Sequence, residues 1–318
     1  MTAIVGILNK KGVAIAADSA STTKNKIINS GNKMLRLSDV IPAAVMVVNN
    51  STLATMPWEV IIRWYRKENG QNKFGNLLDC MDDFFSFVNN RVLKRDDILD
   101  EQCIFDKDVT THLVFAGYGA NEFMPSIFGR YIYGINRRKL LVKPETGTEE
   151  YEFELTSSDK DVTIYAQGQP EIIKSYIHGV IDSHVDKLIN GHVDILIESI
   201  KNLCYEFLPE EEAILFDANT ISTNGFRKRL VSVIDKCKID SEVEWLDSIK
   251  DYNLQKMASL AENLIKATEL RKKIMNETEE VGGLIDLAII SKNDGFQWLN
   301  RKSWYDPSRG GQYGKFGI

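Results

Sequence analysis

Short apolar runs alternate with polar turns at the start of the chain and predict strands. Residues 3–8 (AIVGIL) and 13–17 (VAIAA) are apolar at nearly every position, which is typical of strands covered on both faces. The polar loop 9–12, which ends in glycine, predicts a hairpin between them. After a polar segment, residues 33–37 and 43–48 predict two more strands. We therefore expect four antiparallel strands within the first fifty residues.

Helical spacing of apolar side chains replaces this pattern at Pro57, a residue type favoured in the first turn of a helix. The spacing continues to Gly70 and returns over 76–93, whereas the charged residues 94–110 predict a loop. The elements expected in the rest of the chain are strands at 112–117, 130–135 and 162–166, a helix from Pro170 to about residue 189, helices over 193–276 with breaks near Pro209, Gly225 and 238–242, and a closing hairpin of strands 284–290 and 296–301.

The order of these elements predicts the architecture. Strands from both ends of the chain suggest one sheet layer that the C-terminus closes. Blocks of strands with helices between them predict an α+β fold, a four-layer α-β-β-α sandwich of two antiparallel sheets. Since no repeat or low-complexity linker divides the chain, we expect a single domain over 1–318 with helical insertions at about 67–110 and 190–250.

Composition narrows the class of protein. The chain has 318 residues, of which 43% are hydrophobic and 26% charged, as in an ordinary soluble globular protein. Its net charge of -6 includes no basic run, which argues against a nucleic-acid partner. No signal-peptide pattern opens the chain, and no apolar run reaches the roughly 18 residues that span a bilayer. These features predict a cytoplasmic protein with no membrane partner.

Cysteine and histidine spacing indicates neither a metal site nor a disulfide framework. The four cysteines form no C-x-x-C pair and are far apart: Cys80, Cys103, Cys204 and Cys237. The four histidines show no spacing typical of metal ligands: His112, His178, His184 and His192. We expect reduced thiols, no metal and no cofactor.

Thr2 is the first candidate for chemistry. If Met1 is removed, the Thr2 hydroxyl and a free α-amine lie on one residue, and an amine with a reference pKa of about 7.7–8.0 can accept the hydroxyl proton. Lys33 begins a strand predicted to lie beside the first hairpin, and its charge would keep that amine neutral. Asp18, at the end of the second strand, would pair with Lys33. Each residue alone has an ordinary explanation, but their joint placement at three strand ends favours catalysis.

The stretch TAIVGILNKKGVAIAADSAST at 2–22 resembles the N-terminus of proteasome β-subunits and their bacterial relatives, the N-terminal-nucleophile (Ntn) hydrolases. GNKMLRL at 31–37 is similar to the segment that carries the catalytic lysine of that family. The resemblance implies the Ntn-hydrolase fold, with Thr2 as the nucleophile, Asp18 as the orienting carboxylate and Lys33 as the cation. It also implies that Thr22 binds the substrate backbone.

Later segments resemble the same family with two departures. AAVMVVNN at 43–50 resembles the strand that leads to the oxyanion-binding N–H, where Asn49 replaces the usual glycine. Asparagine tolerates a positive φ better than most residues. VTIYAQGQPE at 162–171 resembles the turn of a helper serine, whose place Gln167 takes before Gly168, and GGLIDLAIISKNDGFQWL at 282–299 resembles the closing hairpin.

The leading hypothesis is therefore a threonine-type, proteasome-like hydrolase of peptide bonds. The residues expected to contact the substrate are Thr22, Asn49, Gln167 and Gly168. The resemblance implies a peptide or protein substrate and a ring-shaped homo-oligomer, and it leaves open an unfoldase or activator as a further partner. Two alternatives stay open: a catalytically silent scaffold or binding protein, which the lost glycine and serine favour, and a small-molecule amidase on the same fold.

Overall fold

The computed structural model describes residues 3–23, 26–28, 32–95, 111–144, 152–180, 182–207, 223–275 and 281–301. The chain divides into two compact units, one formed by residues 1–170 with 248–318 and the other by residues 171–247. The expectation of a single domain over 1–318, with insertions near 67–110 and 190–250, stays a prediction.

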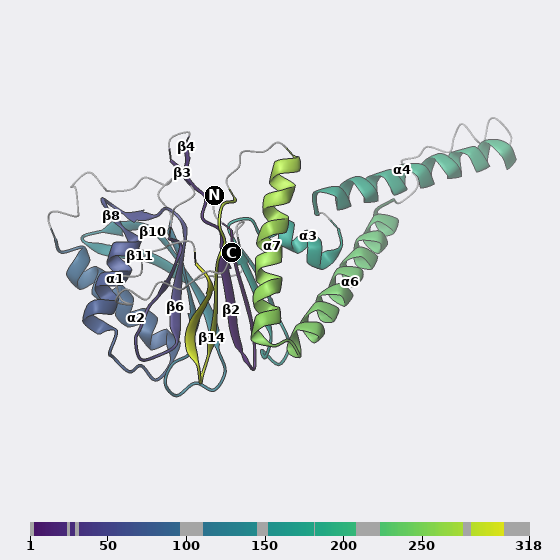
Figure 1. The fold of residues 1–318 in the computed structure, drawn as a ribbon. Helices are drawn as coiled ribbons and strands as arrows, with labels where there is room; N and C mark the ends of the chain where they lie inside the picture. Colours follow the sequence, from purple (N-terminus) through teal and green to yellow (C-terminus); the bar gives the residue numbers. More distant parts are fainter. Residues whose placement is uncertain are drawn as a thin grey trace, which may run out of the picture. The chain divides into compact units, whose positions relative to one another are not determined.

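Two antiparallel sheets form the centre of the first unit (Figure 1). The first sheet has the order β12 (Glu152–Thr156), β13 (Thr163–Gln167), β1 (Ile4–Asn9), β2 (Gly12–Ala17), β14 (Asp286–Ser291), β15 (Gly295–Asn300). The second sheet has the order β11 (Lys139–Pro144), β10 (Ser126–Asn136), β9 (Thr111–Gly117), β6 (Ala43–Asn49), β5 (Met34–Arg36). Two short hairpins accompany them, β3 (Ser21–Thr23) with β4 (Lys26–Ile28) and β7 (Thr52–Leu53) with β8 (Met56–Pro57).

A hydrophobic core joins the two sheets. Side chains of β1, β2 and β14 on one side and of β6 and β9 on the other form a single buried cluster. Gly6 of β1 belongs to this contact, because a Cβ atom there would collide with the side chain of Ile127 on β10. All positions of β1 and β2 are buried, since α7 (Leu254–Ile274) packs against the same strands. The apolar runs at 3–8 and 13–17 thus reflect burial on both faces.

A second core lies between the other sheet and two helices of the first unit. Helix α1 (Trp58–Asn69) and helix α2 (Leu77–Phe87), which continues into a π-helical turn, η1 (Val88–Val92), pack on β5, β6 and β9. Figure 1 shows these helices on the opposite side of the sheets from α7. The predicted mixture of helices and antiparallel sheets is confirmed.

The second unit consists of helices. It contains α3 (Pro170–His178), α4 (Asp182–Phe207) and most of α6 (Thr223–Lys250). His178 of α3 contacts Glu242 of α6, with 2.6 Å between Nε2 and Oε1. Along α4, burial decreases from Val193 (2% exposed) to Phe207 (74% exposed). The far end of α4 therefore carries an apolar face that no described residue covers.

Most predicted elements are confirmed, and the exceptions have local causes. The helix that begins at Pro170 ends at His178 rather than near residue 189, because Gly179 adopts a positive φ of 69°. Helix α6 continues through Gly225, since a glycine inside a helix costs only about 1 kcal/mol, and through 238–242, which contains neither glycine nor proline. The predicted break near Pro209 lies outside the described residues. Strands β11 and β12 were not predicted, because charged neighbours hide their short apolar runs. The short hairpins β3–β4 and β7–β8 were not predicted either, because their strands have only two or three residues.

Candidate active site

A buried carboxylate is the centre of the candidate site. Asp18 follows β2 directly and is fully buried. One oxygen, Oδ1, accepts hydrogen bonds from the Ala3 backbone N–H (2.9 Å) and from the Lys33 ammonium (2.7 Å). The other, Oδ2, accepts from the N–H groups of Ala20 (3.2 Å) and Gly282 (3.3 Å). Four donors therefore compensate the cost of removing this charge from water.

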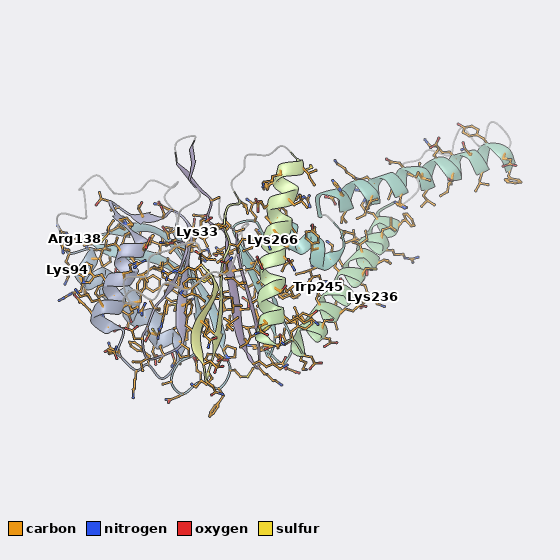
Figure 2. All side chains as sticks on the ribbon, viewed as in Figure 1. Lys33, Lys94, Arg138, Lys236, Trp245 and Lys266 are labelled. Carbon is orange, nitrogen blue, oxygen red and sulfur yellow. The ribbon has the colours of Figure 1, made fainter. Side chains whose placement is uncertain are left out.

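Lys33 reaches Asp18 from the opposite sheet. It immediately precedes β5, and its carbonyl accepts the Val47 N–H at 2.7 Å, which attaches it to β6. The expectation that its strand lies beside the first hairpin is wrong, because β5 belongs to the second sheet. Its side chain is 9% exposed, and its ammonium reaches Asp18, which follows β2 of the first sheet. Figure 2 places Lys33 near the upper end of the sheets. The expected pairing with Asp18 is present, whereas the catalytic roles of both residues stay predictions.

Gln167 lies at the same end of the first sheet. In the register of that sheet, Ile4 pairs with both Gln167 and Ala17, so the turn after β13 is two strands away from Asp18. Gln167 is 2% exposed, and its Oε1 accepts the Tyr165 hydroxyl at 3.1 Å. Gly168 follows with a φ of 91°. A buried amide bound to Tyr165 orients the turn and has no hydroxyl with which to relay a proton.

Asn49 ends β6 beside the Lys33 end of the second sheet. The Val47 N–H donates to the Lys33 carbonyl, and Asn49 follows Val47 by two residues on the same strand. Asn49 therefore lies close to Lys33 along the edge of the sheet. Its φ is 68°, the left-handed conformation that asparagine tolerates and that a glycine would adopt without strain. The backbone thus turns away from the sheet at the position expected to bind an oxyanion.

Two of the predicted residues lie wholly or partly outside what the structure describes. Thr2 lies outside the described residues, one position before Ala3. Thr22 is the middle residue of β3, and its side chain lies outside what the structure describes. Of the three predicted catalytic residues, the structure describes Asp18 and Lys33. For Thr2, it describes only the next residue, Ala3, whose N–H donates to Asp18.

Other groups at this end of the sheets were not predicted. The Gly282 carbonyl accepts the N–H groups of Ser19 (3.2 Å) and Ala20 (3.0 Å), so the chain before β14 is bound to the loop after β2. The Ser19 hydroxyl is buried, with no hydrogen-bond partner among the described residues. Asp286, the first residue of β14, is 1% exposed and pairs with Ala17. Asp286 could have been predicted from the sequence as a buried carboxylate near the site, because it interrupts the apolar run LIDLAII.

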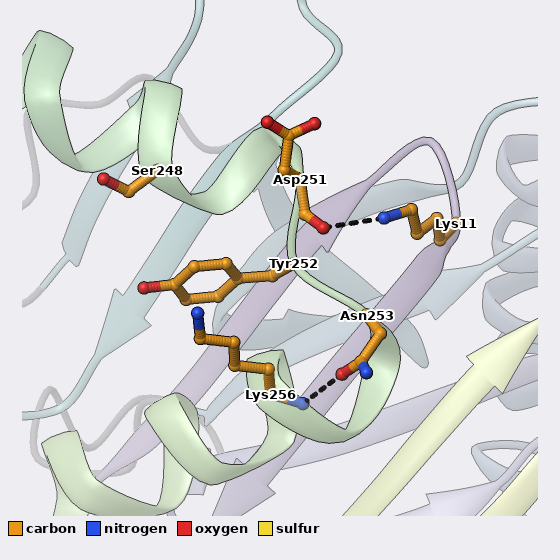
Figure 3. A pocket seen from close by; sticks show the side chains of 6 residues that line it. All are labelled: Lys11, Ser248, Asp251, Tyr252, Asn253 and Lys256. Carbon is orange, nitrogen blue, oxygen red and sulfur yellow. Dashed lines mark hydrogen bonds between the residues drawn. The ribbon is translucent and has the colours of Figure 1, made fainter.

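A surface pocket of about 640 Å³ lies elsewhere (Figure 3). Its lining includes Lys11, from the turn between β1 and β2, and Tyr252, Asn253 and Lys256 around the start of α7. Asp18 follows the other end of β2, so this pocket is remote from the candidate site. Lys256 rests over the Tyr252 ring at 3.9 Å, and the Lys11 ammonium donates to the Asp251 carbonyl.

In the described part of the chain, no helix is long and apolar enough to cross a membrane. No cluster of three or more His, Cys, Asp or Glu side chains in the described ranges could hold a metal ion.

The likenesses to known proteins are structural and distant. No family model matches the chain, and no curated protein matches its sequence. Among solved structures, it is similar to Anbu (ancestral beta-subunit) from Yersinia bercovieri, with 12% identity, a TM-score of 0.43, and coverage of 94% of this chain and 87% of that chain. It is also similar to the Anbu (Gly-1) mutant from Hyphomicrobium sp. strain MC1, with 12% identity, a TM-score of 0.44, and coverage of 94% and 86%.

These findings correct the expected family. The expectation that the chain belongs to the proteasome β-subunit family of Ntn hydrolases is wrong, because no family model matches and the similar structures are Anbu proteins at 12% identity. Short motifs such as those at 2–22 and 31–37 produce false matches unless their structural context agrees. At TM-scores below 0.5, these likenesses do not indicate what this chain does.

Proposed function

We propose that this protein is an amide hydrolase that cleaves peptide bonds with Thr2 as its nucleophile. The observation that carries the proposal is the buried Asp18–Lys33 pair, whose carboxylate also holds the N–H of Ala3, the residue after Thr2. A buried ion pair adds little to stability, since well-packed apolar side chains often replace one at no cost. A buried lysine and aspartate that also bind the residue after Thr2 therefore favour a chemical role.

In the proposed reaction, the Thr2 Oγ attacks the carbonyl carbon of the substrate, and its proton passes to the Thr2 α-amine. The carbonyl π electrons move onto oxygen, and the backbone N–H of Asn49 donates to that oxyanion. When the intermediate collapses, the C–N bond breaks, and the leaving amine takes the proton from the α-ammonium. Water then attacks the ester and loses a proton to the α-amine, which returns it to the Thr2 oxygen as the acid product departs.

The other residues have supporting roles in this proposal. The Lys33 charge keeps the nearby α-amine neutral and so able to accept a proton, and Asp18 holds Lys33 in place. Thr22 and Gly168 would bind the backbone of a peptide, and the Gln167 amide would orient the turn. The two sheets with their outer helices would form the four-layer α-β-β-α sandwich expected from the sequence. A cytoplasmic location and an unfoldase or activator as a partner also stay predictions.

We also propose a homo-oligomer in which α4 of one copy meets α6 of another. Leu203 (53% exposed) and Phe207 (74% exposed) carry the uncovered apolar face of α4. Helix α4 contains five acidic and two basic residues, whereas residues 227–238 of α6 contain five basic residues and one acidic residue. The opposite charges of these two surfaces favour a second copy as the occupant.

The test is covalent trapping of Thr2. Intact-mass spectrometry first establishes whether the mature protein starts at Thr2. A peptide epoxyketone should then add its mass to the N-terminal peptide, because it closes a ring on both the hydroxyl and the adjacent amine of one residue. Thr2→Ala should abolish the adduct, and Lys33→Met should slow its formation, whereas Lys256→Met, a matched change in the remote pocket, should not.

The outcomes separate the hydrolase from its alternatives. A protein that starts at Thr2 and is labelled neither by the epoxyketone nor by a small uncharged warhead would be a scaffold or binding protein. The observation favouring that alternative is the Gln167–Tyr165 contact, which occupies the place of a proton-relaying hydroxyl. Labelling by the small warhead alone would favour a small-molecule amidase.

A further inference from the structure

The turn that follows Asn49 is held by several hydrogen bonds. A non-glycine residue at positive φ costs on the order of 1 kcal/mol or more, and it persists where its surroundings fix it. The Asn50 side-chain oxygen accepts from the N–H (3.2 Å) and the hydroxyl (3.1 Å) of Thr52. The Ser51 carbonyl accepts the N–H of Trp58, the first residue of α1, at 2.9 Å. The turn is therefore attached to the helix that follows it.

Thr111 connects this turn to the core. It is the first residue of β9, it pairs with Asn49 in the sheet register, and it is 2% exposed. Its Oγ1 accepts a hydrogen bond from the Trp58 indole N–H at 3.2 Å and donates one to the Asn50 carbonyl at 3.3 Å. Since a hydroxyl has one proton to donate, these two bonds determine the direction of the link, from indole to hydroxyl to carbonyl.

The link has a geometric consequence for the backbone. A peptide unit is planar, and its C=O and N–H point in opposite directions. Holding the Asn50 carbonyl against Thr111 therefore fixes the following peptide plane and restrains ψ of Asn50, next to Asn49 with its positive φ. The Trp58 ring, which is fully buried against α2, gives this arrangement a rigid anchor.

We propose that Thr111 is a positioning residue, whose hydroxyl ties the Trp58 indole to the Asn50 carbonyl and so fixes the turn that presents the Asn49 N–H to the substrate. This inference rests on the proposed hydrolase function. It differs from a merely structural role, because loss of the hydroxyl should weaken stabilisation of the transition state more than it weakens binding of the substrate.

The test replaces Thr111 by residues of similar size. Thr111→Val removes the hydroxyl but keeps the shape, and Thr111→Ser keeps the hydroxyl. We expect kcat for a fluorogenic peptide to fall about 10-fold to 100-fold in Thr111→Val, with little change in KM. This loss is smaller than the roughly 10²-fold to 10³-fold drop in kcat that follows removal of a whole oxyanion donor. Thr111→Ser should restore most of kcat. Thr163→Val, a buried threonine at the far end of the first sheet that bonds Thr156, is the matched control and should keep full activity.

A second readout does not depend on turnover. In ¹⁵N-labelled protein, the amide resonances of Asn49, Asn50 and Ser51 should shift in Thr111→Val and keep their positions in Thr111→Ser and Thr163→Val. Trp58→Phe, which removes the indole donor, should reproduce the shifts and serves if Thr111→Val does not fold. Unshifted amides, or unchanged kcat in an active wild type, would overturn the inference. Shifted amides in a protein whose Thr2 is never labelled would support the positioning of the turn and reject the hydrolase.

Discussion

Removing either charge of the Asp18–Lys33 pair should destabilise the protein by unequal amounts. Lys33→Met deletes one charge-assisted hydrogen bond, but Asp18 keeps three backbone N–H donors, from Ala3, Ala20 and Gly282. The expected loss is therefore about 1.5–3 kcal/mol. Asp18→Asn leaves the 9%-exposed Lys33 without this carboxylate and turns a new amide N–H₂ toward existing donors. Its expected cost is about 3–5 kcal/mol.

The assay is urea and thermal unfolding followed by tryptophan fluorescence. For a protein of this size, 1 kcal/mol corresponds to roughly 2–4 °C in Tm, so Asp18→Asn should lower Tm by roughly 6–20 °C. The double variant should be more stable than Asp18→Asn, because it also removes the buried ammonium that has lost this carboxylate. Glu262→Gln breaks the exposed Glu262–Lys266 pair and should cost only about 0.5 kcal/mol or less.

Two results would refute this reasoning. Equal losses in Asp18→Asn and Lys33→Met would mean that the three backbone donors do not compensate the carboxylate. A cost for Asp18→Asn as small as that of Glu262→Gln would mean that the site is not desolvated as its burial indicates. In either case, the electrostatic argument for a chemical role of Lys33 would lose its basis.

Three further predictions concern other parts of the chain. Burial lowers the pKa of His112 from 6.5 to about 3. Between these values the unfolded chain binds a proton that the folded chain does not, so the free energy of unfolding should fall as the pH drops through this window. His112→Phe should reduce that loss, measured by urea midpoints at about pH 7 and 4.5. Gly117→Ala should lower Tm, because its Cβ would collide with the Pro42 carbonyl, whereas Gly191→Ala inside α4 should stabilise the helix by about 0.5–1 kcal/mol in chemical unfolding. Phe207→Glu should lower the mass measured by light scattering if α4 joins copies, and an unchanged oligomer would reject that surface.

The elements of the two sheets could be predicted because their signals are local. Continuous apolar runs indicate that β1 and β2 are buried on both faces, and the turn 9–12 determines that they pair as a hairpin. The start of α1 after Pro57 and the closing hairpin of β14 and β15 follow from the same kind of signal. Strands β11 and β12 escaped prediction, since short runs with charged neighbours resemble loops.

The candidate site could be predicted only as residue types at strand ends. Asp18 follows an apolar strand, and Lys33 precedes one, so both lie at the edge of a sheet. The sequence could not indicate that β5 joins the second sheet, because strand pairing depends on contacts between residues far apart in the chain. The family expectation was wrong for a related reason, since motifs of a few residues do not specify a whole fold.

The sequence by itself shows which polar residues interrupt the apolar pattern. Each of these residues needs a hydrogen-bond partner if it is buried. Only the tertiary structure decided what those partners are. Asp18 is bound by Ala3, Lys33, Ala20 and Gly282, which come from the start, the first fifth and the end of the chain. The physical reason is that apolar periodicity depends on neighbours along one strand or helix, whereas the environment of a buried charge depends on the packing of one sheet on the other.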